Sequence, residues 1–173
     1  MSFNELVQTI ESSDVFKDFQ QKHPDATLCA GFFIIDMVGN DNKQAIDYKN
    51  DTSIFSFSVD DLGNITVQED ELIQVAGRPQ LKPLEKKITI DHDQMIIIAK
   101  KALADNKIIP KLQKIIAVVQ RHVGKESEDN EIQIWNLTCM LEGLGIINML
   151  VDSDSAVILK FEKKSVMDFM KKN

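Results

Sequence analysis

Apolar and polar positions follow a helical period at the start of the chain. Apolar residues recur every three or four positions between residues 3 and 19, which predicts amphipathic helix. A polar break at residues 12–14 indicates that this helix is divided into two. Ser2, followed three positions later by Glu5, has the capping-box pattern and predicts where the first helix begins. Pro24 predicts the end of the second, because the residue before a proline avoids helical backbone.

The pattern then changes to that of β-strands. Residues 27–38 form a long apolar run rich in β-branched and aromatic side chains, which predicts a buried strand. Shorter strands are expected at residues 43–49, 53–59 and 65–68. Residues 60–64, Asp-Asp-Leu-Gly-Asn, predict a hairpin turn, since Asp and Asn tolerate left-handed backbone and Gly adopts it freely. The first part of the chain is therefore predicted to be helix followed by antiparallel strands.

The middle of the chain is more polar. Residues 69–77 are compatible with a short helix, and residues 78–90, which contain two prolines, are predicted to be a linker. Asp91 is a predicted N-cap for a further helix, whose apolar face extends from Met95 to Leu103.

A second group of strands follows that helix. Residues 114–123 are ambiguous in period and also fit a helix, but their place in the order of elements favours a strand. Residues 124–130 are expected to be an acidic loop, and residues 165–172 a short closing helix. The remaining strands are predicted at residues 131–141, 146–151 and 156–161.

The two halves of the chain carry a similar motif. Residues 59–65 (VDDLGNI) are echoed by residues 151–157 (VDSDSAV), and an apolar run precedes each copy. The predicted fold class is therefore α+β, with two helix-on-antiparallel-sheet units related by internal duplication. The first unit is assigned to residues 1–77 and the second to residues 91–173, on either side of the linker. One shared globular domain is also compatible with this division.

An aromatic strand followed by an Asp-led turn resembles a known family. Trp135 lies in EIQIWNLTCM and the turn in NMLVDSDSAVILKF, while the first half has Tyr48 in QAIDYKN and its own VDDLGNI turn. The chain thus resembles a tandem of PepSY-like modules, small α+β units in the cystatin-like class. This resemblance implies a non-catalytic module that binds or restrains partner proteins, including peptidases.

Composition narrows the classes of function. The chain has 173 residues, of which 43% are hydrophobic and 27% charged, as is usual for a globular protein. A formal charge of −7 disfavours nucleic-acid binding, which depends on basic side chains. The N-terminus does not follow the signal-peptide pattern, and no apolar run is long enough to span a membrane, so a cytoplasmic location is expected. Cys29 and Cys139 are predicted to be reduced, buried thiols, with a disulfide between them as the lesser alternative.

Motifs for metal binding or catalysis are not found in the sequence. His23, His92 and His122 differ in their surroundings, and none has the spacing of a zinc site. Residues 152–155 resemble the start of a calcium loop, but Val157 stands where that loop requires glycine. No phosphate-binding or nucleophile-elbow motif occurs. We therefore expect no metal, no cofactor and no catalytic residue.

The sequence favours a non-enzymatic protein-binding or regulatory role. Tyr48 and Trp135 are the candidate partner-binding residues, because aromatic side chains often concentrate binding energy; the competing interpretation is that both pack against helices. A homo-oligomer is compatible with this role. The alternative function is a carrier of a small apolar ligand in a cavity of the curved sheet. The residues that could line such a cavity are Phe32, Phe33, Phe55, Phe57, Met140 and Met149.

Overall fold

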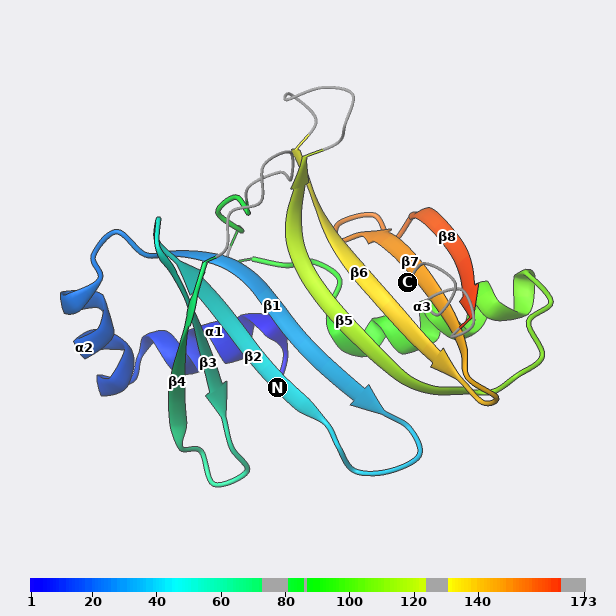
Figure 1. Ribbon diagram of the computed structural model, residues 1–173, viewed down its shortest axis with the longest axis horizontal. Coiled ribbons are helices and arrows are strands. Elements are labelled where there is room, and N and C mark those ends of the chain that lie inside the picture. Colours follow the sequence, from blue (N-terminus) through cyan, green and yellow to red (C-terminus); the bar gives the residue numbers. More distant parts are fainter. Residues whose placement is uncertain (73–80, 86, 124–130, 166–173) are drawn as a thin grey trace.

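The computed structural model describes residues 1–72, 81–85, 87–123 and 131–165 (Figure 1). Two helices precede the first four strands, and a third helix precedes the last four. In chain order the elements are α1 (Phe3–Glu11), α2 (Asp14–Lys22), β1 (Thr27–Asp36), β2 (Lys43–Lys49), β3 (Ser53–Val59), β4 (Ile65–Glu71), α3 (His92–Asp105), β5 (Leu112–Val123), β6 (Glu131–Leu141), β7 (Gly145–Asp152) and β8 (Ile158–Ser165).

All the strands belong to one sheet. The eight strands lie in the order β4-β3-β2-β1-β5-β6-β7-β8, and every neighbouring pair is antiparallel. In the middle of the sheet β1 pairs with β5, from Ala30 opposite Gln120 to Asp36 opposite Lys114. The two groups of strands predicted from the sequence are therefore joined edge to edge in a continuous sheet. The result is a mixed α+β fold.

The helices begin where the sequence predicts. The hydroxyl of Ser2 accepts a hydrogen bond from the Glu5 N–H, and the Glu5 carboxylate accepts one from the Ser2 N–H. The Ser13 hydroxyl caps α2 by accepting the Phe16 N–H, without a reciprocal side-chain bond, and Asp91 forms a capping box with Gln94 at the start of α3. These caps satisfy N–H groups that a helix leaves without partners at its N-terminus.

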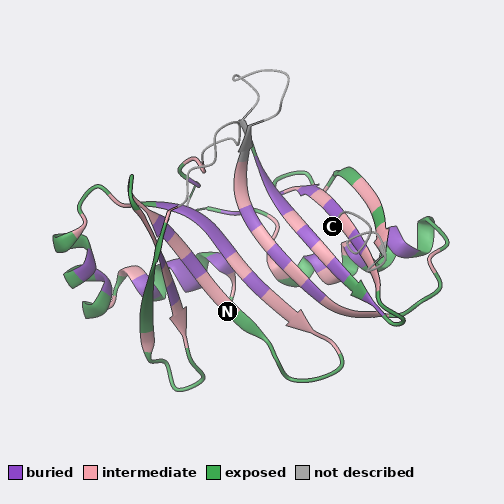
Figure 2. Cartoon of the chain, viewed as in Figure 1, coloured by how far each residue is buried: buried purple, intermediate pink, exposed green. Residues whose placement is uncertain are grey.

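The core lies between the helices and one face of the sheet; in the view of Figure 1, α1 and α3 pass behind the sheet and α2 lies at its left-hand end, beside β4. Buried and half-buried residues alternate along the central strands (Figure 2), as expected when only one face is packed. Gly31 allows α1 to approach closely, because a Cβ there would lie 2.6 Å from a ring carbon of Phe3. The largest fully buried side chains are Trp135, Phe3, Phe33, Phe57 and Leu6.

The two echoed motifs are both hairpin turns. Asp60, between β3 and β4, accepts hydrogen bonds from the N–H groups of Leu62 and Asn64. Asp152, the last residue of β7, accepts from those of Asp154 and Ser155 in the turn that leads to β8. The prediction that these residues form turns is confirmed, and each turn connects the third strand of its group to the fourth.

Several predicted boundaries were wrong. β1 ends at Asp36 rather than at residue 38, because the Asp36 carboxylate accepts the N–H groups of Val38 and Gly39 and starts a turn. β4 continues to Glu71, so the predicted helix at residues 69–77 is wrong over 69–71, where pairing with β3 outweighs local preference. The rest of that helix, the loop at 124–130 and the closing helix after residue 165 lie outside the described residues.

Candidate functional site

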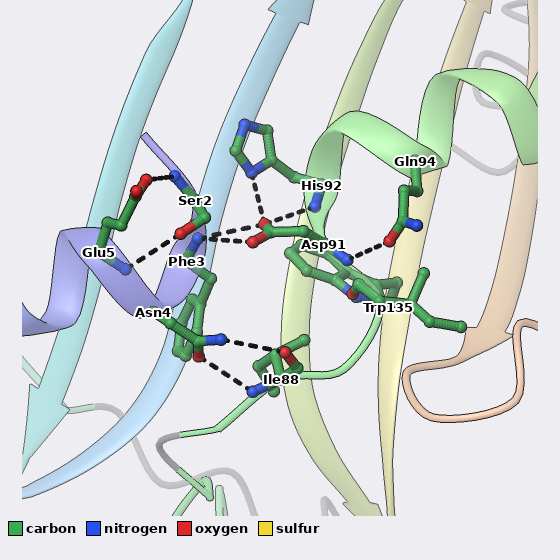
Figure 3. A network of polar contacts seen from close by, with 10 residues as sticks. Ser2, Phe3, Asn4, Glu5, Ile88, Asp91, His92, Gln94 and Trp135 are labelled. Carbon is green, nitrogen blue, oxygen red and sulfur yellow. Dashed lines mark hydrogen bonds and ion pairs between the residues drawn. The ribbon is translucent and has the colours of Figure 1, made fainter.

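The carboxylate of Asp91 lies between the N-termini of two helices (Figure 3). It caps α3, where Oδ1 accepts the N–H of His92 at 2.7 Å. It also accepts the N–H of Phe3, the first residue of α1, at 3.1 Å to Oδ1 and 3.0 Å to Oδ2. Helix N-termini carry partial positive charge, so one carboxylate stabilises both ends at once. Asp91 therefore ties the helix over the first half of the sheet to the helix over the second.

The surroundings of Asp91 favour its ionised form. Burial by itself raises the pKa of this carboxyl, but hydrogen bonds from His92 and from the Phe3 N–H outweigh burial. The pKa of Asp91 is therefore below its usual value. At neutral pH the group is a charged acceptor for both helices.

A second set of contacts holds the segment that precedes α3. The Asn4 side chain donates to the Ile88 carbonyl at 3.1 Å and accepts the Ile88 N–H at 3.0 Å. The indole Nε1 of Trp135 donates to the Ile90 carbonyl at 2.7 Å (Figure 3). The described part of the predicted linker is thus packed against α1 and β6.

His92 extends from this junction with its ring held on two sides. Its Nδ1 lies 2.8 Å from Oδ1 of Asp91. Its ring stacks on Phe33 of β1, with 4.1 Å between ring centroids and 9° between ring planes. The side chain remains 19% exposed. An imidazole fixed in this way presents its other nitrogen, Nε2, in a defined direction.

Beside His92 there is a cavity of about 700 Å³. Its walls come from β1, from β2 and the residue before it, from the hairpin of β3 and β4 with its turn, from the start of α3, and from Met1. Apolar atoms predominate in the lining, and polar side chains, among them His92, Asp93 and Lys43, add hydrogen-bonding groups. A cavity of this size with a few polar groups is typical of sites for small molecules.

Tyr48 and Trp135, the candidate partner-binding residues, both lie in the core. Trp135 is 0% exposed and bonded to Ile90, while Tyr48 is 3% exposed and its hydroxyl donates to the Glu11 carboxylate at 2.6 Å. Burial and this contact raise the pKa of Tyr48. The structure therefore gives both side chains a packing role. Partner binding by them stays a prediction, and because they expose almost no surface, the proposals below do not use it.

The residues expected to line an apolar cavity do not come together. Phe32 and Phe33 line the cavity beside His92, but Phe55 lines a separate hollow under α2. Phe57 and Met149 are fully buried in the core. Met140 is 36% exposed, so it is not enclosed by either hollow.

The thiols and histidines complete the site-residue predictions. Cys29 and Cys139 are free and buried, as the sequence predicted, and burial raises the pKa of both thiols to about 12. His23 packs against Phe55 beside α2, far along the chain from the cavity residue His92.

Within the described ranges, no group of three or more His, Cys, Asp or Glu side chains could hold a metal ion. No described helix has both the length and the apolar character of a membrane span.

Sequence reasoning missed the pairing of Asp91 with His92. Asp91 was predicted as a cap, and a histidine directly after an N-cap is a signal that could have drawn attention to the pair. The second role of Asp91, as acceptor for Phe3, depends on a contact between residues 88 positions apart. No local pattern encodes such a contact.

Comparison with known proteins identifies a shared fold and nothing more specific. No protein-family model matches the chain, and no curated protein matches it. Its structure is similar to the crystal structure of a putative lipoprotein from Clostridium difficile 630, with a TM-score of 0.54 and 15% sequence identity. The match covers 87% of this chain and 91% of the other. At that identity the similarity concerns the fold, and it agrees with the α+β class.

Proposed function

We propose that this protein is a non-enzymatic binding protein that takes up a small, largely apolar ligand in the cavity beside His92. The observation that carries the proposal is the cavity itself, about 700 Å³ in volume and lined mainly by apolar atoms. Sites of this kind bury most of a small ligand and use a few polar groups to orient it. From the sequence alone, ligand binding was the alternative to protein binding. We place it first here because the fixed His92 ring lies beside the cavity.

His92 is proposed to orient the ligand. Asp91 engages Nδ1, so Nε2 is the ring nitrogen that would contact a ligand. Stacking on Phe33 fixes the plane of the ring, which reduces the entropy lost when a ligand binds. A ligand with an apolar body and one hydrogen-bonding group fits this arrangement.

The test uses the uncharged apolar dye N-phenyl-1-naphthylamine and two isoleucine variants on the same helix. Ile96 lines the cavity, whereas its neighbour Ile97 is 70% exposed and does not. We expect Ile96→Trp to fill the cavity and weaken dye binding at least several-fold, while Ile97→Trp leaves it unchanged. Equal dye binding by both variants would show that the cavity is not the site. Native mass spectrometry of the purified protein would reveal a ligand retained from the cell.

Protein binding at the helix-free face of the sheet is the second candidate. Phe32 and Ile34 of β1, which also contribute to the cavity beside His92, pair with Val118 and Ile116 of β5. All four are only half-buried and alternate with buried residues along their strands. An apolar surface at the centre of a sheet fits an apolar segment of a partner protein. A captured partner should be lost with Val118→Lys and retained with Ile97→Lys, a change on the exposed side of α3. Loss with both variants, or with neither, would contradict this candidate.

We further propose that the two halves arose by duplication of a PepSY-like unit, and that the protein is cytoplasmic. The strand order is consistent with duplication, since each half runs from a central strand outward to an edge strand. Tyr48 and Trp135 occupy the second strand of their halves and face the core. Superposition of residues 27–71 on residues 112–123 and 131–165 by a single rotation would test the duplication. The free thiols are compatible with a reducing compartment, and cell fractionation would test the location, since the structural neighbour is described as a lipoprotein.

A further inference from the structure

The two outer strands of the sheet carry opposite charge. β4 (Ile65–Glu71) contains Glu69, Asp70 and Glu71 and no basic residue, and all three acidic residues are exposed. β8 (Ile158–Ser165) contains three lysines and one glutamate. The strand order places these two strands at opposite ends of the sheet. One edge is therefore acidic and the other is basic.

Both edges have an unpaired side in the part of the chain that the structure describes. There β4 pairs only with β3, and β8 only with β7. The outer N–H and C=O groups of an edge strand can form a ladder with a strand of another chain. Charged side chains normally prevent this, because like charges repel when two similar edges meet. Repulsion therefore disfavours pairing of β4 with β4, or of β8 with β8, between two copies of the chain. The opposite charges of β4 and β8 favour pairing of β4 of one copy with β8 of another.

We infer that this protein associates head to tail with a second copy of itself, β4 of one copy pairing with β8 of the next. The inference goes beyond ligand binding in the cavity and does not depend on it. The contact is heterologous, so successive copies form either a closed ring or an open chain. Val67 and Leu159, 43% and 48% exposed, contribute apolar area to the joint.

Strand direction is compatible with this joint. Neighbouring strands are antiparallel throughout, including the central pair β1 and β5. It follows that β4 and β8 of one chain run in opposite directions. A second copy added in the same orientation brings its β8 antiparallel to β4 of the first. The helices of both copies then lie on the same face, and the antiparallel pattern continues across the joint.

The experiment reverses the charge of each edge separately. Asp70→Lys/Glu71→Lys makes both edges basic, and Lys160→Glu/Lys163→Glu makes both acidic. Asp25→Lys/Asp105→Lys is the control for the first variant, because it changes the net charge equally at exposed sites outside β4, outside β8 and outside the hollow that β4 shares with α2. Circular dichroism and Trp135 fluorescence would establish that each variant is folded, and sedimentation velocity over a range of concentration and salt would measure association.

The expected result has three parts. The native protein and the control associate with rising concentration, and salt weakens the association because the charges are exposed. Each edge variant alone is monomeric at concentrations where the native protein associates. An equimolar mixture of the two edge variants associates again, since the basic edges of one meet the acidic edges of the other. A native protein that stays monomeric at every concentration, an edge variant that still self-associates, or a mixture that stays monomeric would overturn the inference.

Discussion

The carboxylate of Asp91 offers a direct test of how the two halves are coupled. Asp91→Ala removes the cap of α3 and also leaves the part-buried Phe3 N–H without its acceptor. Loss of an N-cap costs about 1 kcal/mol. An unsatisfied buried N–H costs a further ~1–3 kcal/mol. The expected decrease in the free energy of unfolding is therefore roughly 2–4 kcal/mol, and for a chain of this size Tm should fall by roughly 5–15 °C.

Ser13→Ala is the matched control for this change. Ser13 caps α2 through the Phe16 N–H at 3.1 Å, and its hydroxyl donates to the Ile10 carbonyl at 2.6 Å, but among the described contacts its side chain serves no other helix N-terminus. Its loss should cost about 1 kcal/mol. The assay is urea unfolding followed by circular dichroism, which reports on all helices, and by fluorescence of Trp135, the only tryptophan, which lies in the second half. If Asp91→Ala costs no more than Ser13→Ala, the carboxylate does not join the two helices.

The pH dependence tests the charge of Asp91. The pKa of this carboxyl is lowered in the folded protein, so its contribution is complete above the unfolded pKa of about 3.9 and is lost as pH falls through the folded pKa. Asp91→Asn keeps one oxygen acceptor but not the charge, so it should be less stable than the native protein at pH 7. The difference should become smaller below about pH 4. A difference independent of pH would contradict the role assigned to the ionised group.

Three further predictions concern buried positions. Gly31→Ala should lower the free energy of unfolding by about 1–3 kcal/mol in urea titrations, because the new Cβ would overlap the buried Phe3 ring; unchanged stability would mean that α1 can move away. Burial raises the pKa of Asp47, so the ionised carboxylate destabilises the folded protein at pH 7. Asp47→Asn should therefore increase the free energy of unfolding at pH 7, and this increase should disappear at acid pH, where Asp47 is protonated. A lower free energy of unfolding for Asp47→Asn at pH 7 would refute this. Burial raises the pKa values of Cys29 and Cys139 to about 12. Both thiols should therefore react with a thiol reagent at pH 8 only as fast as the protein unfolds. A rapid phase of reaction in the folded protein would count against their burial.

Local pattern was sufficient to predict most of the elements. The capping box of Ser2 and Glu5 and the cap at Asp91 depend on residues close in sequence, and both were found from spacing alone. The strand at residues 114–123 had no decisive period, because Ile116 and Val118 on its half-buried face are as apolar as the residues that face the core, and only its place in the order of elements identified it. β4 was shortened in the prediction because Glu69–Glu71 disfavour strands locally, whereas pairing with β3 decides their conformation.

The candidate site was less accessible to sequence reasoning. Trp135 was a candidate partner-binding residue, with packing against a helix as the competing interpretation; its indole is buried and bonded to a carbonyl 45 positions earlier in the chain. The cavity beside His92 is formed where the ends of β1–β3 meet the start of α3, so its existence depends on how far the helices extend over the sheet. Local sequence patterns do not specify that distance.

The seam between β1 and β5 has a consequence for biosynthesis. Ala30 and Gln120 face each other across the seam, although β5 is made long after β1. When the ribosome has released only the first four strands, β1 is a temporary outer strand with its partner still untranslated. A nascent chain paused at that stage would expose the unpaired backbone and the apolar side chains of residues 30–36 to other chains, so we expect it to be a substrate for chaperones until the fifth strand, β5, has emerged.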